Sequence, residues 1–277
     1  MLKKPDWLRV PYSDDQNSHF VTELLDELNL NTVCIEANCP NRAECFASKS
    51  ATFMILGRNC TRKCSFCNVK YAAPEPVDVI EPMRVANAVK RLGLRYVVIT
   101  SVTRDDLPDG GAGQFAQVIR EMRKISPETT VEVLIPDLSE LKAIIDEVPT
   151  VISHNIETVA SLYADVRQGA DYRRSLDVLK NITLLNPEIY TKSGMMLGLG
   201  ESRDEVLEAF DDLLEVGCRF LTIGQYLSPT KNHYPVKEYI HPQAFDEYAD
   251  IARKRGFRHV ASAPFVRSSY KADKAVL

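Results

Sequence analysis

The chain has 277 residues, of which 45% are hydrophobic and 26% are charged, as in an ordinary globular protein. Its 34 Lys and Arg against 38 Asp and Glu residues give a net charge of −4, so no overall positive field indicates nucleic acid as a partner. No apolar run approaches the roughly eighteen residues of a transmembrane helix, so we expect no membrane span. The N-terminal lysines Lys3 and Lys4 precede no apolar stretch, which predicts no secretory signal and a cytoplasmic location.

Short apolar runs alternate with amphipathic segments from about residue 52 onward. The predicted strands are 52–56, 96–100, 130–135, 151–156, 190–197 and 220–223. The predicted helices are 81–92, from 110–113 to about 126, 139–147 with a serine cap, 161–186 with a break at Gly169, 203–216 and 242–255. Six strand-then-helix units predict an α/β fold with a parallel sheet, in the form of a partial (β/α)6 barrel of the TIM type.

We divide the chain into three parts. Residues 1–50 are an irregular N-terminal extension with one helical stretch at about 20–28 and the first cysteine group. Residues 51–257 are the partial barrel, and residues 258–277 are a C-terminal tail. In such barrels the active site lies at the carboxyl ends of the strands, which here are followed by the polar segments 100–103, 154–157, 198–201 and 224–226.

The cysteines carry the strongest signal of the sequence. There are seven, and all except Cys218 lie between Cys34 and Cys67. In a reducing cytosol such a group binds metal more often than it forms disulfides. Cys218 lies late on an apolar helix, between Gly217 and Arg219, and we interpret it as a small core residue.

The segment C-T-R-K-C-S-F-C places Cys60, Cys64 and Cys67 in one loop after the first barrel strand. Three thiolates at this spacing can hold three corners of a cubane iron–sulfur cluster and leave the fourth iron open to a small molecule. The alternative is a zinc site that takes a fourth ligand, such as a histidine, from elsewhere.

This C-x3-C-x2-C loop, with the aromatic Phe66 before its third cysteine, resembles that of the radical S-adenosylmethionine (SAM) superfamily. The resemblance implies that Cys60, Cys64 and Cys67 hold a 4Fe-4S cluster whose open iron chelates SAM. Reductive cleavage of SAM would then give methionine and a 5′-deoxyadenosyl radical that removes an unactivated hydrogen atom.

A second trio, Cys34, Cys39 and Cys45, has C-x4-C-x5-C spacing, which by itself leaves a structural and a catalytic metal site equally open. Its full string, C-I-E-A-N-C-P-N-R-A-E-C, resembles the auxiliary-cluster motif of the lipoyl synthases. Three more stretches do so too: P-D-W-L-R at 5–9, T-S-V-T-R-D-D-L at 100–107 with D-G-G-A at 109–112, and R-S-S-Y at 267–270. The resemblance covers nearly the whole chain.

The resemblance implies that Cys34, Cys39 and Cys45 hold an auxiliary 4Fe-4S cluster with Ser269 as fourth ligand, and with Ser268 as the alternative. A serine oxygen is a hard donor on a soft-ligand cluster, so it is lost more easily than a thiolate when the cluster gives up sulfur. Taken without the family, the two serines form an ordinary polar turn.

The implied reaction is the insertion of two sulfur atoms at carbons 6 and 8 of an octanoyl group that is linked to a lysine of a lipoyl carrier domain. The auxiliary cluster would be the sulfur donor. The implied carriers are acyltransferase subunits of 2-oxoacid dehydrogenases and the glycine cleavage H protein, and a ferredoxin or flavodoxin would supply electrons. The alternatives are a methylthiotransferase, whose RNA-binding domain has no room here, a biotin synthase-like enzyme, and a zinc-binding interaction module.

Seven strand-end residues are predicted to contact SAM: Thr100, Ser101, Thr103, Asn155, Glu157, Gly198 and Gln225. By resemblance, segment 100–103 faces the methionine amino group, Asn155 and Glu157 face the ribose or carboxylate, and Gln225 lies near adenine. The G-x-G at Gly198 has a tight turn as its alternative, and Asn155 could equally satisfy backbone groups. Residues 104–106 are either a solvated charge cluster or a lid.

Overall fold

The computed structural model describes residues 2–9 and 15–276. The chain forms two compact units. The N-terminal unit consists of Val10–Thr61 and Asn68–Ile152, and the C-terminal unit consists of Met1–Arg9, Arg62–Cys67 and Ser153–Leu277. We describe each unit by itself.

The N-terminal unit contains the strands β1 (Asn31–Thr32), β2 (Thr52–Ile55), β5 (Tyr96–Ser101) and β6 (Thr130–Leu134), which pair in that order. β1 is antiparallel to β2, whereas β2, β5 and β6 are parallel, with Phe53 opposite Ile99. A small parallel pair joins β3 (Asn59–Cys60) to β4 (Lys70–Tyr71). The chain passes into the other unit within β7 (Val151–Ser153).

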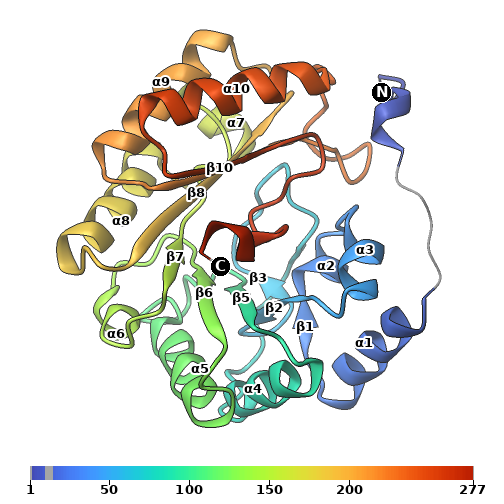
Figure 1. Ribbon diagram of the computed structural model, residues 1–277, viewed down its shortest axis with the longest axis vertical. Helices are drawn as coiled ribbons and strands as arrows, with labels where there is room; N and C mark the ends of the chain where they lie inside the picture. The colour runs from blue at the N-terminus through green and yellow to red at the C-terminus, as the bar shows by residue number, and fades with distance from the viewer. Residues whose placement is uncertain (1, 10–14, 277) are drawn as a thin grey trace. The chain divides into compact units, whose positions relative to one another are not determined.

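The helices of this unit are α1 (Gln16–Glu27), α2 (Val33–Glu36), α3 (Arg42–Ala47), α4 (Glu81–Leu92), α5 (Ala112–Ile125) and α6 (Lys142–Ile145). α4 starts with Glu-Pro and ends at Gly93, whose φ of +67° suits a residue without a side chain. It buries Val85, Val89 and Leu92, and it packs side by side with α5 (Figure 1).

The C-terminal unit contains the parallel strands β8 (Tyr190–Leu197), β9 (Phe220–Gln225) and β10 (His259–Ser262). Its helical elements are η1 (Asp6–Leu8), η2 (Ala160–Leu162), α7 (Tyr163–Val166), α8 (Tyr172–Leu185), α9 (Arg203–Glu215), α10 (Pro242–Arg255) and η3 (Ala272–Ala275). α8, α9 and α10 lie along one side of the strands (Figure 1). Phe210 of α9, Leu221 of β9 and Phe245 of α10 are fully buried in the shared core.

The predicted α/β fold with mostly parallel strands and helical crossovers is confirmed. All six predicted strands are present, and the helices α4 and α10 have the predicted bounds. The break at Gly169 is also present, with a φ of +79°. The division at residues 50 and 257 stays a prediction.

Two local predictions were wrong, and one strand was missed. Helix 139–147 shrinks to α6, whose start carries no side-chain cap. The region before residue 50 was predicted to be irregular apart from one helical stretch at about 20–28, which α1 overlaps, but it also holds β1, α2 and α3. These short elements of two to six residues leave no apolar periodicity to detect. β10 was missed within the tail, since its sequence H-V-A-S has only one fully buried side chain, Val260.

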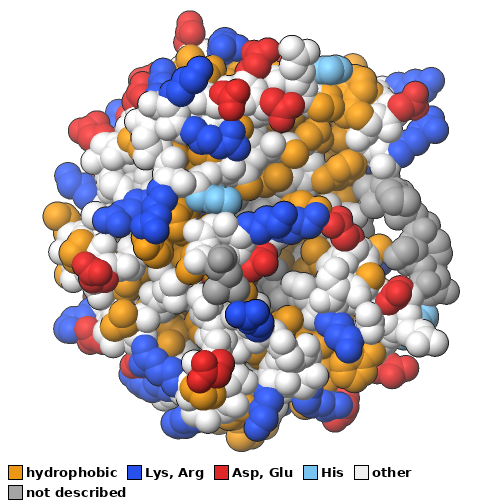
Figure 2. Space-filling model, viewed as in Figure 1, with side chains coloured by type: hydrophobic (Ala, Val, Ile, Leu, Met, Phe, Trp, Pro, Cys, Tyr) orange, Lys and Arg blue, Asp and Glu red, His pale blue; other side chains and the backbone are white. Residues whose placement is uncertain are grey.

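Acidic and basic side chains are interspersed over the face drawn in Figure 2, with no patch of a single sign dominating it. Within residues 2–9 and 15–276, every helix is too short or too polar to cross a membrane.

Candidate active site

The end of β2 is held from both sides before the chain enters the second cysteine group. The backbone N–H of Leu56 donates to Glu81 Oε2 at 3.0 Å, and Arg104 Nη1 donates to the Leu56 carbonyl at 3.2 Å. Arg104 is only 3% exposed and makes two hydrogen bonds to Asp106, each 2.8 Å long. Arg104 is therefore neither part of a solvated charge cluster nor a lid residue; it is a buried support for the turn at Leu56.

Thr61 ties the cysteine loop to the end of β5. Its backbone N–H and its hydroxyl both donate to the carbonyl of Thr103, at 3.1 and 3.0 Å. The residue directly after Cys60 is thereby fixed at the strand end that was predicted to face SAM. Cys60 itself lies in β3, and its carbonyl accepts from the N–H of Ala72 at 3.4 Å.

The hydroxyls of Thr100 and Ser101, at the end of β5, differ in their hydrogen bonding. The Thr100 hydroxyl donates to the carbonyl of Leu134 at 2.9 Å, and Thr100 is 7% exposed. The Ser101 hydroxyl is buried and has no hydrogen-bond partner within the described residues. A buried hydroxyl without a partner costs stability, so the Ser101 oxygen suits a polar group of a bound ligand.

The first cysteine trio lies wholly in the N-terminal unit. Cys34 is the second residue of α2, and its N–H donates to the hydroxyl of the N-cap residue Thr32 at 3.0 Å. Cys39 follows in the next turn, with its N–H donating to the Cys34 carbonyl at 3.1 Å, and Cys45 lies in α3. Backbone hydrogen bonds thus fold residues 34–45 into one compact segment. It carries one thiol in α2, one in the turn that follows and one in α3.

The loop of Cys64 and Cys67 is anchored within the C-terminal unit. The Ser65 hydroxyl donates to the Asp165 carbonyl at 2.6 Å, and its carbonyl accepts from the N–H of Tyr234 at 2.8 Å. His233 Nε2 donates to the carbonyl of Cys67 at 3.1 Å. Phe66 packs against a small apolar cluster of Val166, Leu199 and Tyr226. The aromatic residue before the third cysteine therefore serves as the loop's apolar anchor.

Asn155 and Glu157 follow Ser153 at the start of the C-terminal unit. Asn155 Nδ2 donates to Glu157 Oε1 at 3.0 Å, and the Ser268 hydroxyl donates to Asn155 Oδ1 at 2.9 Å. Burial raises the pKa of Glu157, while the positive Arg167 and Arg267 and the hydrogen bond from Asn155 oppose this shift. Glu157 also has a positive φ of +67°, a strained conformation of the kind that often marks functional sites.

Gly198 lies where no side chain would fit. Its φ is +95°, and a Cβ there would collide with Gln225 Nε2 and with the backbone carbonyl of Glu238. The N–H groups of Gly198, Leu199 and Gly200 all donate to the Glu201 carboxylate, at 2.6, 2.9 and 3.1 Å. The G-x-G segment is therefore a tight turn closed by Glu201, as its structural alternative predicted.

Gln225 is fully buried, and its amide serves the backbone. Its Nε2 donates to the carbonyls of Leu197, Tyr226 and Glu238, each at 3.0 Å, and its Oε1 accepts from the N–H of Ile240 at 2.8 Å. A cofactor contact at this position would have to come from the backbone of Gln225.

The predicted site residues thus fall into two groups. The N-terminal unit holds Cys34, Cys39, Cys45, Cys60, Thr100, Ser101 and Thr103. The C-terminal unit holds Cys64, Cys67, Asn155, Glu157, Gly198, Gln225 and Ser269.

All seven cysteines are thiols. In the part of the chain that the structure describes, no three His, Cys, Asp or Glu side chains form a group that could hold a single metal ion. The protein ligands of a 4Fe-4S cluster bind different irons, so they need not converge on one point. Two trios of thiols, with an unpaired buried hydroxyl at Ser101, suit such clusters and a polar ligand, and the ligand set itself remains a prediction.

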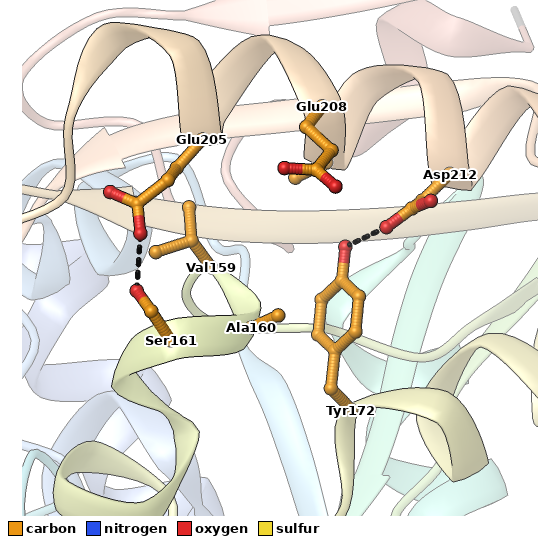
Figure 3. A pocket seen from close by; sticks show the side chains of 8 residues that line it. Val159, Ala160, Ser161, Tyr172, Glu205, Glu208 and Asp212 are labelled. Carbon is orange, nitrogen blue, oxygen red and sulfur yellow. Dashed lines mark hydrogen bonds between the residues drawn. The ribbon is translucent and has the colours of Figure 1, made fainter.

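One cavity of about 160 Å³ lies in the C-terminal unit, between η2, α8 and α9 (Figure 3). Tyr172 points across it to Asp212, with a hydrogen bond of 2.8 Å, and Ser161 donates to Glu205. Burial and the hydrogen bond to Asp212 raise the pKa of Tyr172. None of the predicted site residues lines this cavity, and these two pairs already satisfy much of its polar lining.

Sequence reasoning missed several residues that support the site. Glu81 was visible only as a helix start, His233 has no metal-type spacing, and Ser65 is one small residue in a cysteine loop. Their partners lie 25, 166 and 100 positions away in the chain. Among the supporting residues, only Glu201 could have been found from a local motif, the string G-L-G-E at 198–201.

The model of the radical SAM superfamily matches residues 54–213, more than half of the chain. The solved structure of Streptococcus suis SuiB with bound S-adenosylmethionine has the same fold, with a TM-score of 0.60 at 14% identity over 80% of this chain and 54% of that one. Methylornithine synthase PylB matches 82% of this chain and 68% of its own, with a TM-score of 0.52 at 14% identity. The chain belongs to the radical SAM superfamily, whose members use SAM and an iron–sulfur cluster.

Closer relatives narrow the assignment. The lipoyl synthase of Caldicellulosiruptor saccharolyticus is 57% identical over 276 residues, which are 98% of this chain and 97% of the relative. That of Alkaliphilus metalliredigens is 52% identical over 278 residues, 99% of this chain and 96% of the relative. Within the superfamily, the chain belongs to the lipoyl synthase family, and it is therefore an enzyme of the sulfurtransferase class.

Proposed function

We propose that this chain inserts two sulfur atoms, at carbons 6 and 8, into an octanoyl group that is linked to a lysine of a carrier protein. The main support is the presence of two cysteine trios and the R-S-S-Y segment in a chain that is 50–57% identical to lipoyl synthases over 98–99% of its length. The two C–H bonds are unactivated, so acid–base chemistry alone cannot reach them and a radical cofactor is required.

Two 4Fe-4S clusters are proposed. Cys60, Cys64 and Cys67 would hold the cluster that binds SAM. Cys34, Cys39 and Cys45 would hold the auxiliary cluster, with Ser269 as fourth ligand.

The choice of Ser269 over Ser268 has support in their contacts. The Ser268 hydroxyl is engaged by Asn155, whereas no hydrogen bond to the Ser269 hydroxyl is found within residues 2–9 and 15–276. Ser269 is therefore the serine whose oxygen is available to a metal.

When bound, the cofactors would supply reductive cleavage of SAM for hydrogen-atom abstraction and sulfide sulfur for insertion. The chain's own residues would hold them in place. Ser101 offers its unpaired hydroxyl to SAM, and Asn155 and Glu157 offer an amide and a carboxylate. Thr61 and Ser65 fix the two ends of the cysteine loop through backbone carbonyls, which keeps the thiols in position.

The proposed partners follow from this reaction. The substrates would be octanoylated lipoyl domains, namely the acyltransferase subunits of 2-oxoacid dehydrogenases and the glycine cleavage H protein. A ferredoxin or flavodoxin would donate electrons. We further propose that the enzyme works in the cytoplasm, with residues 1–50 and 258–277 serving the auxiliary cluster and residues 51–257 forming the radical SAM barrel.

The test is anaerobic reconstitution with iron and sulfide, followed by SAM, dithionite and an octanoyl-lysyl peptide. We expect about eight irons per chain, deoxyadenosine, and a peptide that gains two sulfur atoms by mass spectrometry. Deoxyadenosine without sulfur gain would refute the octanoyl substrate. A colourless protein that binds zinc and leaves SAM intact would instead establish the zinc-binding alternative.

Matched cysteine variants assign the clusters. Cys39→Ala should lose irons and sulfur insertion. Cys218→Ala should keep about eight irons, because burial raises the pKa of the Cys218 thiol to about 12 and its sulfur donates to the carbonyl of Phe220. If both variants lose iron equally, cysteine loss itself, and not ligation, explains the result.

A further inference from the structure

The first serine of R-S-S-Y has a defined partner in the C-terminal unit. The Ser268 hydroxyl donates to Asn155 Oδ1 at 2.9 Å, across 113 positions of sequence. Asn155 Nδ2 in turn donates to Glu157 Oε1 at 3.0 Å. Because the two ends of an amide differ, one accepting and one donating, the bond from Ser268 fixes which end of Asn155 faces Glu157.

The backbone on either side of this chain of hydrogen bonds is also fixed. The Glu157 N–H donates to the Gly194 carbonyl at 3.0 Å, and the Glu157 carbonyl accepts from the N–H of Met196 at 2.8 Å. Segment 155–157 is therefore bound to β8 as an extra parallel bridge. Asn155 has little freedom to seek another partner if Ser268 is removed.

The absence of a side chain at Gly194 leaves room for the side chains of Ser268 and Asn155. A Cβ at Gly194 would lie 2.6 Å from Thr222 Oγ1, 2.8 Å from Ser268 Oγ and 2.9 Å from Asn155 Oδ1. Real Cβ contacts are longer than these, so a side chain at residue 194 would displace Ser268 and Asn155 as well as Thr222. The glycine in the middle of β8 thus lets the C-terminal segment approach the strand closely.

Charged groups surround the carboxylate of Glu157, to which Asn155 donates. Burial raises the pKa of Glu157, and the charges of Arg167, His154 and Arg267 lower it, Arg267 being the residue directly before Ser268. The hydrogen bond from Asn155 selects one orientation, and Ser268 holds Asn155 in the state that makes that bond.

We propose that Ser268 is a positioning residue of the SAM site, which orients Asn155 and, through it, Glu157. This inference rests on the proposed function, in which those two residues contact SAM and the neighbouring Ser269 ligates the auxiliary cluster. The two adjacent serines thereby have different roles: Ser269 ligates the auxiliary cluster, and Ser268 supports the residues that bind SAM. Loss of either hydroxyl should therefore affect a different cofactor.

The experiment compares Ser268→Ala with Ser269→Ala in the full, reconstituted chain. The readouts are the iron content and the dissociation constant for SAM, measured by equilibrium dialysis without reductant. We expect Ser268→Ala to keep about eight irons and to bind SAM about five- to tenfold more weakly, as loss of one hydrogen bond predicts. Ser269→Ala should bind SAM normally and retain fewer irons. Ser268→Thr, which keeps the hydroxyl, should restore SAM binding to within about twofold of wild type.

Two results would overturn the inference. One is wild-type affinity for SAM in a folded Ser268→Ala protein, and the other is iron loss equal to that of Ser269→Ala, which would make Ser268 a ligand. If Ser268→Ala does not fold, Gly194→Ala takes its place, since it separates the same two groups, and normal SAM affinity there refutes the inference. A wild-type protein that binds SAM but transfers no sulfur would refute the proposed function alone, because the binding comparison would still decide the role of Ser268.

Discussion

The carboxylate of Glu81 accepts a hydrogen bond from the backbone N–H of Leu56, 3.0 Å away, at the carboxyl end of β2. The same oxygen accepts from Gln114 Nε2, also at 3.0 Å. Leu56 has a φ of +69°, which a branched side chain rarely adopts. The bond from Leu56 to Glu81 thus holds a strained turn four positions before Cys60, and α4 is the element that supplies it.

Removing this carboxylate should destabilise the protein. In Glu81→Ala the buried Leu56 N–H loses the acceptor it has in Glu81, and the Gln114 amide keeps only its bond to the Asp78 carbonyl, which together cost about 2 kcal/mol. Glu81→Gln retains an oxygen that can accept both bonds, so its loss should stay below about 1 kcal/mol. Urea unfolding of the two variants measures the difference, and equal losses would show that Glu81 acts by charge instead.

The pH dependence of Glu81 follows from its burial. Burial raises the pKa of Glu81 above its usual 4.5, although the hydrogen bonds from Leu56 and Gln114 oppose the shift. A carboxyl with a raised folded-state pKa contributes stability that is present below its unfolded pKa and is lost as pH rises through the folded one. Wild type should therefore lose stability relative to Glu81→Gln from about pH 4.5 toward neutral pH. Unfolding curves over this range check the sign, and a parallel pair of curves would contradict it.

Features set by a local sequence pattern could be predicted, whereas contacts between residues far apart in the chain could not. The strands β2 and β5–β9, the helices α4 and α10 and the cysteine trios follow from periodicity and spacing, each within a short window of sequence. The pairs Ser268–Asn155 and His233–Cys67 join residues 113 and 166 positions apart, and no local pattern specifies which distant partner a polar side chain meets. Gln225 shows the same limit: its strand-end position indicated a cofactor contact, yet four backbone groups occupy its amide.

Gly198 offers a test of steric need in the turn after β8. Gly198→Ala should cost more than about 2 kcal/mol, because a Cβ there meets Gln225 and the Glu238 backbone in addition to the strain of a positive φ. Gly169→Ala is the control: it has a similar φ of +79° but nothing within 4 Å, so only about 1 kcal/mol of strain is expected. Thermal or urea unfolding ranks the two, and equal losses would show that the turn adapts to a side chain.

His233 should affect how firmly the cysteine loop holds its cluster. Thr230 donates to His233 Nδ1 at 2.9 Å, which leaves Nε2 to donate to the Cys67 carbonyl at 3.1 Å. His233→Ala removes this bond, so we expect iron to be lost to a chelator several-fold faster, on the order of one hydrogen bond. His19→Ala, at an exposed position in α1, is the matched control and should lose iron at the wild-type rate. A His233→Ala protein that retains iron equally well would show that Ser65 and Phe66 suffice to hold the loop.

Ser101 and Thr100 are neighbours whose hydroxyls should respond oppositely to removal. The Thr100 hydroxyl donates to the Leu134 carbonyl, so Thr100→Val should destabilise the protein by about 1 kcal/mol. The Ser101 hydroxyl is buried without a partner in the described structure. Ser101→Ala should therefore leave the stability of the cofactor-free protein unchanged or raise it by up to about 1 kcal/mol.

The same substitution should weaken SAM binding if Ser101 contacts the cofactor. We expect the dissociation constant for SAM to rise about five- to tenfold in Ser101→Ala. Urea unfolding without SAM and equilibrium dialysis with it give the two halves of the result. A variant that loses stability without SAM and binds SAM normally would show that the hydroxyl serves the fold. Gained or unchanged stability together with weakened binding would place the Ser101 oxygen against the cofactor. A hydroxyl that serves only to bind the ligand contributes no stability to the free protein but is required for affinity in the complex.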